Sequence, residues 1–240
     1  MNPAGDPRTR EIATRLHDVR NRIAAACVAA ARDPSQITMV AVTKSFPVQD
    51  ARRLVELRIR DLGENRDQEA SGKAAELAAD TPPTDVRWHF VGRLQRNKCR
   101  SVASYASVVH AVDRAELVEP LAAGARRAGR AVEVLIQVTL DGDPARGGAL
   151  PGDVPALADA LAAAEPLRLR GVMAVAPLDA DPDAAFARLA ETAAALRADH
   201  PDAAAISAGM SGDLEAAIRN GATHVRIGTA LLGGRASMVR

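Results

Sequence analysis

The chain has 240 residues, of which 48% are hydrophobic and 25% are charged, and its formal net charge is +1. This composition is typical of a folded globular protein and excludes a disordered or fibrous chain. The balanced charge gives no sign of nucleic-acid binding, and no stretch reaches the roughly 18 apolar residues of a membrane span. The amino terminus lacks a secretory pattern, and Cys27 and Cys99 are too widely spaced for a disulfide framework or a metal site. We therefore expect reduced thiols, no bound metal and a cytoplasmic location.

Helical periodicity predicts a first helix over about residues 8–31, where apolar residues recur at three- and four-residue steps. After it, short apolar runs rich in β-branched residues alternate with helical segments. The predicted strands are 37–43, 61–64, 86–91, 108–112, 132–140, 167–175, 203–206 and 223–227. The predicted helices between them are 48–60, 66–79, 95–104, 114–128, 153–164, 182–198 and 211–220.

Eight strands that alternate with helices favour an α/β fold, a (β/α)8 barrel with an extra amino-terminal helix. A doubly wound open sheet is the alternative, because it shows the same alternation. No linker-like segment divides the sequence, so we expect one domain over residues 1–240, with its core at about 10–235. In a barrel, functional side chains are expected at the carboxyl ends of the strands.

Lys44 directly follows the first predicted strand and is one of only three lysines, against 28 arginines. Burial of its ammonium would lower its pKa and make the amine nucleophilic, as Schiff-base formation with an aldehyde requires. The structural alternative is a lysine that reaches from a strand end into water. His89 lies near the end of the third predicted strand, where it is as consistent with a core position as with a functional one.

The last two predicted strands lead into loops of small residues, 207–213 and 226–229. Loops after strands seven and eight are where barrels commonly bind phosphate, and small residues let the backbone approach an anion. Ordinary tight turns are the alternative. A lysine after strand one and a phosphate site at these loops predict a ligand with an aldehyde and a phosphate. Pyridoxal 5′-phosphate (PLP) is one such ligand, and a sugar phosphate is another.

Six segments of the sequence stand out, in this order: Ala41–Lys44, Gly63–Asn65, Trp88–Lys98, Gly171–Ala174, Gly209–Asp213 and Val225–Thr229. Together they resemble the PLP homeostasis proteins, which are small single-domain relatives of the alanine racemase barrel. The resemblance runs from about residue 10 to 235, and the block Trp-His-Phe-x-Gly-x-Leu-Gln-x-Asn-Lys at 88–98 is long and specific.

The resemblance implies PLP bound covalently, as a Schiff base on Lys44. It places Arg226 beside the cofactor, either at the pyridine nitrogen or at the phosphate. The other implied positions contact the phosphate, support it through the backbone or lie near the pocket. The phosphate contacts are Ser211, Gly228 and Thr229, the backbone support comes from Gly209 and Met210, and the nearby positions are Asn65, His89 and Ser207.

Racemases of this barrel type use a second base, a tyrosine from an added domain. Only about a dozen residues follow Gly228, so we expect no such domain, and the one tyrosine, Tyr105, precedes the fourth predicted strand. We therefore expect a PLP-binding protein with no catalytic residues, which acts in vitamin B6 homeostasis and delivers PLP to apo-enzymes.

Two enzymatic alternatives remain at this point. One is a weak PLP-dependent amino-acid racemase. The other is a Schiff-base aldolase, which would need an acid–base group near Lys44; the sequence shows no second lysine or paired carboxylate at the adjacent strand ends. We expect a monomer, with no nucleic-acid or membrane partner.

Overall fold

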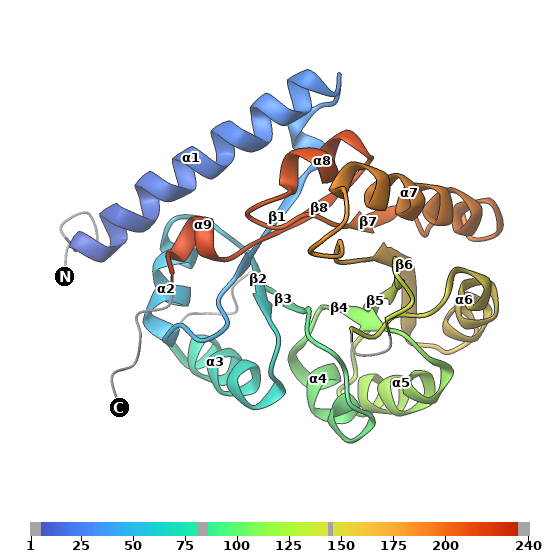
Figure 1. Cartoon of the computed structure of the whole chain (residues 1–240). Helices are drawn as coiled ribbons and strands as arrows, with labels where there is room; N and C mark the ends of the chain where they lie inside the picture. The colour runs from blue at the N-terminus through green and yellow to red at the C-terminus, as the bar shows by residue number, and fades with distance from the viewer. Residues whose placement is uncertain (1–5, 81–85, 144–145, 235–240) are drawn as a thin grey trace.

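The computed structural model describes residues 6–80, 86–143 and 146–234. Eight parallel strands follow one another around a closed barrel, and β1 pairs with β8 to complete it (Figure 1). The strands are β1 (Thr38–Val42), β2 (Asp61–Glu64), β3 (Arg87–Phe90), β4 (Val108–Val112), β5 (Val132–Gln137), β6 (Leu167–Met173), β7 (Ala205–Ser207) and β8 (His224–Ile227). The predicted barrel is confirmed, and the doubly wound alternative is wrong because an open sheet has no such closing pair.

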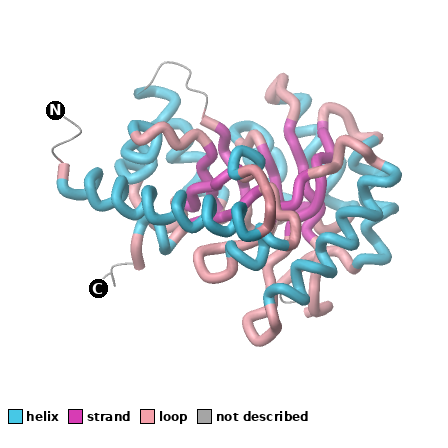
Figure 2. Tube along the Cα trace, turned by 90° about the horizontal axis from the view of Figure 1, so that it is seen from above, coloured by secondary structure: helices cyan, strands magenta, loops and turns pink. Residues whose placement is uncertain are grey.

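Helices surround the strands, as Figures 1 and 2 show from two directions. The α-helices are α1 (Pro7–Ala29), α2 (Val48–Glu56), α3 (Asp67–Asp80), α4 (Cys99–Tyr105), α5 (Val118–Arg127), α6 (Val154–Ala162), α7 (Pro182–Asp199), α8 (Leu214–Arg219) and α9 (Thr229–Leu232). Short 3-10 turns are η2 (Pro34–Gln36), η3 (Arg96–Lys98), η4 (Ala115–Leu117) and η5 (Pro151–Asp153). Within the described ranges, no helix is both long enough and apolar enough to span a membrane.

Several helices are shorter than the sequence predicted, and α2 and α8 show why. The helix α2 ends at Glu56 because Arg58 adopts a left-handed φ of 64°, which a continuing α-helix cannot accommodate. The helix α8 begins at Leu214 rather than at Ser211, since the preceding residues form a turn. The second difference changes the structure of one predicted phosphate loop.

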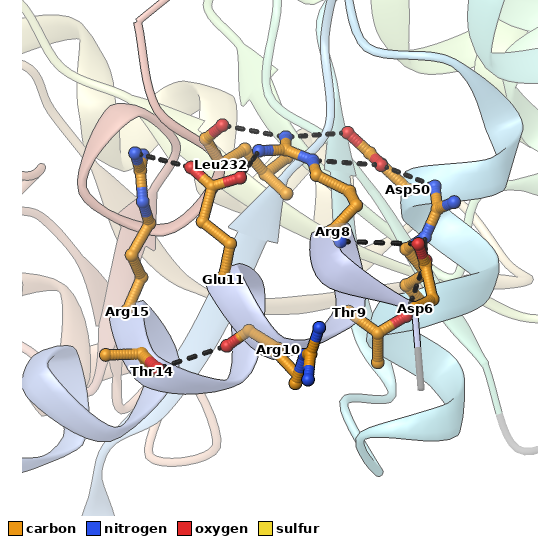
Figure 3. A network of polar contacts seen from close by, with 10 residues as sticks. Asp6, Arg8, Thr9, Arg10, Glu11, Thr14, Arg15, Asp50 and Leu232 are labelled. Carbon is orange, nitrogen blue, oxygen red and sulfur yellow. Dashed lines mark hydrogen bonds and ion pairs between the residues drawn. The ribbon is translucent and has the colours of Figure 1, made fainter. Parts of the chain in front are cut away.

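The extra amino-terminal helix α1 packs against α8 and α9, outside the barrel. Its buried face is apolar and consists mainly of Ile12, Leu16, Val19 and Ile23. At its amino end, the Arg8 guanidinium donates two hydrogen bonds to buried Asp50 of α2, at 2.8 and 3.4 Å, and one to the Leu232 carbonyl oxygen at 2.8 Å (Figure 3). The first helix is thereby joined to the last one.

The inside of the barrel has an apolar side and a polar side. The apolar side is formed by Val108, Ala111, Leu135 and Met173. The polar side contains Asp61, His89, His110, Ser207, His224 and Arg226. Strand alternation separates Trp88, which packs in the outer apolar cluster, from His89, which points inward. These two neighbours therefore lie on opposite faces of β3.

Candidate functional site

Lys44 lies at the carboxyl-terminal mouth of the barrel, two residues beyond the end of β1. Its side chain is exposed, and it makes no hydrogen bond or ion pair with the described part of the chain. The desolvation that the sequence argument considered is therefore not provided by the protein alone. Ser45 has a left-handed φ of 65°, which turns the chain sharply after Lys44.

A buried ion cluster lies beneath this turn. The Lys73 ammonium donates hydrogen bonds to Glu64 Oε1 at 2.6 Å, to Glu69 Oε1 at 2.7 Å and to the Thr43 carbonyl oxygen at 2.8 Å. The Thr43 hydroxyl donates to the same Glu64 oxygen, and the Ser45 amide donates to Glu69 at 2.7 Å. The cluster therefore holds the backbone on both sides of Lys44.

This cluster was not apparent from the sequence. The adjacent strand ends have no second lysine or paired carboxylate in the sequence, but the structure brings Lys73 and Glu69 to this place from helix α3. Lys73 and Glu69 are four residues apart on α3, a spacing that also describes an ordinary solvent-exposed helix pair. The one available signal was the scarcity of lysine, which was applied only to Lys44.

Arg226 lies on β8, the strand that pairs with β1, and is 5% exposed. Its Nη1 donates to the Ser207 carbonyl oxygen at 2.8 Å and to Ser207 Oγ at 2.7 Å, and its Nη2 donates to the Ala174 carbonyl oxygen at 2.8 Å. No carboxylate of the described chain lies within ion-pair distance. Burial lowers the pKa of Arg226 to about 10, so the group is cationic at neutral pH. A buried cation with only neutral partners is poised to attract an electron-rich ligand atom.

The loops after β7 and β8 lie side by side at this mouth. The Gly209 carbonyl oxygen accepts a hydrogen bond from the Arg226 amide at 2.9 Å, and Ser211 Oγ accepts one from the Ala230 amide at 3.2 Å. Gly209 has a φ of 88°, and a Cβ there would lie 2.6 Å from the Ala217 methyl group, so only glycine fits. The structure thus brings Gly209 and Ser211 next to the segment that contains Gly228 and Thr229.

One expected phosphate donor is already used. The Met210 amide donates to Asp213 Oδ1 at 2.6 Å, because the chain forms a turn here before α8 begins. The family resemblance implied backbone support for the phosphate at Met210, but its N–H is bonded within this turn. Ser211 and Thr229 retain hydroxyl groups at the surface of the mouth, half-buried and exposed respectively.

His89 lies inside the barrel, where it joins a row of polar side chains. Its Nε2 is 2.9 Å from Asp61 Oδ1, and its Nδ1 is 2.8 Å from His110 Nε2. His110 Nδ1 is in turn 2.9 Å from Ser207 Oγ, which accepts from Arg226. His89 therefore reaches the mouth only through other residues. His110 was not singled out from the sequence, although a histidine within an apolar strand was a visible signal.

Burial dominates the titration of these histidines. It lowers the pKa of His89 and brings the pKa of His110 well below its usual range. It also lowers the pKa of His224, whose ring lies about 6 Å from both, to about 4. For Asp61, burial acts to raise the pKa, but the hydrogen bond from His89 and nearby positive charge lower it overall. The interior is therefore set for neutral histidines and an ionised carboxylate at pH 7.

A cavity of about 490 Å³ opens between the loops after β2 and β3. Asn65, Arg66 and Arg93 line it, together with Glu69 from the cluster under the Lys44 turn. Gly92 brings the two loops together, since a Cβ at this position would overlap the Asn65 carbonyl oxygen. Of the predicted cofactor residues, only Asn65 lines this cavity.

Comparison with known proteins first identifies the class of the fold. The model of the family "Alanine racemase, N-terminal domain" matches residues 16–236. The alanine racemase of Clostridium difficile superposes with a TM-score of 0.71 at 15% identity, over 95% of this chain and 58% of that chain. At that identity the likeness concerns the fold alone. The barrel is thus of the alanine racemase amino-terminal class, as the resemblance implied.

Similarity to curated proteins is closer. The PLP homeostasis protein of Mycobacterium tuberculosis is 44% identical over 243 residues, covering 95% of this chain and 94% of that protein. The one from Escherichia coli K12 is 35% identical, covering 94% and 97%. The structure of PipY from Synechococcus elongatus with PLP bound has a TM-score of 0.80 at 34% identity, covering 92% of this chain and all of that chain. This chain belongs to the PLP homeostasis protein family.

Proposed function

We propose that this protein binds PLP, holds it as a Schiff base on Lys44, and serves in intracellular PLP homeostasis and delivery. The observation that carries the proposal is the pair of cations at one mouth of the barrel. The Lys44 amine is exposed and unpaired within the described chain, while Arg226 is buried without a carboxylate. Their strands, β1 and β8, are hydrogen-bonded neighbours.

The residues at the mouth fit this cofactor. PLP supplies an electrophilic aldehyde, an electron-withdrawing ring and a phosphate when bound. The Lys44 ammonium gives up one proton, and the amine then condenses with the aldehyde and releases one water molecule. Ser211, Gly228 and Thr229 are the proposed phosphate contacts, with support from Gly209.

We place the ring nitrogen against Arg226, because this residue lies on β8 itself, before the loop segment that contains Gly228 and Thr229. A guanidinium at that nitrogen disfavours its protonation, since two adjacent positive charges repel. The ring is then a weak sink for electrons. This supports a role in holding the cofactor rather than in carbanion chemistry.

We further propose that the protein is not a robust enzyme. Its one tyrosine, Tyr105, ends α4, and burial together with the nearby Asp67 carboxylate raises its pKa. Lys44 can move a proton on one face of a bound amino acid, but two-base racemisation needs a group on the opposite face. A weak racemase activity is the alternative that a direct assay would detect.

The proposal extends to the setting of the protein. Residues 1–240 act as one cofactor-binding domain and as a monomer that meets PLP-dependent apo-enzymes only transiently. The two cysteines are free and buried, which fits a reducing compartment such as the cytoplasm.

Absorption spectra of the purified protein with PLP test this proposal, before and after borohydride reduction. We expect a visible Schiff-base band, and a reduced adduct that peptide mass analysis places on Lys44. Lys98→Ala, which removes a different lysine near the mouth, is the matched control and should retain the adduct. Transfer of PLP to an apo-enzyme would support delivery, whereas efficient turnover of an amino acid would contradict it.

A further inference from the structure

We infer that a chain of hydrogen bonds, all donated in the same direction, runs through the barrel from its amino-terminal mouth. This chain fixes the position of Arg226. The chain consists of Asp61, His89, His110, Ser207 and Arg226. It begins at the first residue of β2, at the amino-terminal mouth, and ends beside the proposed cofactor site. Except for Asp61, each residue in it is at most 5% exposed. Water therefore has little access to the central links.

The direction of every link follows from the two ends. A guanidinium can only donate, so Ser207 Oγ accepts from Arg226 at 2.7 Å. An ionised carboxylate can only accept, so His89 Nε2 donates to Asp61 at 2.9 Å. Neutral His89 then accepts at Nδ1 from His110 Nε2, and His110 Nδ1 accepts the proton of the Ser207 hydroxyl. Both histidines are thereby assigned the Nε2–H tautomer.

The reverse direction requires an extra proton. If His110 donated to Ser207, its Nε2 would have to accept from His89, and His89 would need a proton on both nitrogens to keep Asp61. The charged and titratable groups that act on these two rings are Asp61, Arg87, Glu133, His224 and Arg226. Burial outweighs the attraction of the two carboxylates and favours neutral rings, in agreement with the forward direction.

The direction of the chain determines the orientation of the Ser207 hydroxyl. Because its proton is given to His110, its oxygen presents only lone pairs to Arg226. That fixes one edge of the guanidinium, and the Ala174 and Ser207 carbonyl oxygens fix the rest of its orientation. His110, His89 and Asp61 are thus positioning residues for Arg226, although none of them is a predicted phosphate contact or covalent anchor.

Histidine ¹⁵N NMR on the protein without added cofactor tests the chain directly. At pH 7, we expect His89 and His110 as neutral Nε2–H tautomers, with slow exchange of the His110 proton. Exposed His17, on α1, provides the reference signal of a surface histidine. A cationic His89, or a His110 protonated at Nδ1, would overturn the assignment. This result does not depend on the proposed function.

PLP affinity tests the effect on Arg226, and this part rests on the proposed function. Asp61→Ala removes the acceptor at the far mouth, and Ser207→Ala removes the hydroxyl next to Arg226. Each should weaken PLP binding by about threefold to tenfold, the usual net value of one hydrogen bond. The control is Glu119→Ala, which removes an exposed carboxylate on the outer helix α5 that pairs with Arg126 instead.

The double variant separates a connected chain from two independent defects. Because both changes interrupt the same chain, Asp61→Ala and Ser207→Ala together should cost little more than the larger single effect. Multiplying effects, or normal affinity in Asp61→Ala, would overturn the inference. If the wild-type protein did not bind PLP, the proposed function would be contradicted. The NMR result would still decide the tautomers of His89 and His110.

Discussion

Two buried polar networks of the described chain lead to the proposed cofactor site, one from beneath the Lys44 turn and one through the barrel interior, and they are built in different ways. Under the Lys44 turn, a full positive charge on Lys73 faces Glu64 and Glu69 at 2.6 and 2.7 Å. Inside the barrel, neutral histidines separate Asp61 from Arg226. The ionic cluster holds backbone atoms, whereas the histidine chain holds one side chain. A fixed turn under a free amine suits reaction, and a fixed guanidinium suits recognition.

Substitution of Lys44 and of Lys73, one at a time, should have the largest effects and is the strongest test of this difference between the two networks. Lys44→Ala should abolish the Schiff-base band completely, because the exposed amine is the proposed reacting group. The free energy of unfolding should change by less than about 0.5 kcal/mol, since the side chain is exposed and makes no hydrogen bond or ion pair with the described chain. Absorption spectra and urea unfolding measure the two effects. An intact band would move the anchor to another residue.

Lys73→Met should do the opposite: it should lower the stability strongly and leave the Schiff-base band in place. Removal of one partner from a buried ion pair typically costs about 3–5 kcal/mol, because the remaining charge is left without compensation. Burial raises the pKa of Glu64, and the Lys73 hydrogen bond opposes that shift, so Glu64 should take up a proton more readily in this variant. Urea unfolding measures the loss. Wild-type stability would mean that the cluster contributes nothing net.

The stability of the protein at acid pH should depend on the buried histidines inside the barrel. The folded pKa of His224 is about 4, against an ordinary value of 6.5, so the unfolded chain binds the proton more tightly. Stability should therefore fall as the pH drops from about 6.5 to 4, by about 3 kcal/mol from this residue. His89 and His110 shift in the same direction. His224→Gln should flatten this part of the pH profile, and an unchanged profile would contradict the assignment.

We expect the smallest effect on stability from the partly exposed ion pair between Arg8 of α1 and Asp50. Arg8 is about a quarter exposed and pairs with Asp50, which keeps Arg53 as a second partner. Arg8→Ala should cost only about 1 kcal/mol, because water and Arg53 replace the lost contact. Thermal unfolding measures it, with exposed Arg10→Ala as the control. A loss as large as that in Lys73→Met would remove the distinction between buried and surface networks.

The sequence predicted the barrel because periodicity, strand order and loop composition all derive from local residue patterns. It placed Lys44, Ser211 and Arg226 at strand ends for the same reason. It could not predict that Lys73 is buried and Lys44 exposed, since burial depends on which helix face meets which strand. Nor could it connect His89 to Ser207, because His110 is the link and three separate strands supply the pieces.

The closing strand pair has a consequence for synthesis of the protein. The strand β1 cannot complete its pairing until β8 has been translated, and the bond from Arg8 to Leu232 joins residues 224 positions apart. Such non-local contacts slow folding, because a long loop must close before any of them forms. On the ribosome, the nascent chain therefore exposes an unpaired edge of β1 until β8 has emerged. The proposed PLP site, which needs both β1 and β8, is completed only after β8 has emerged.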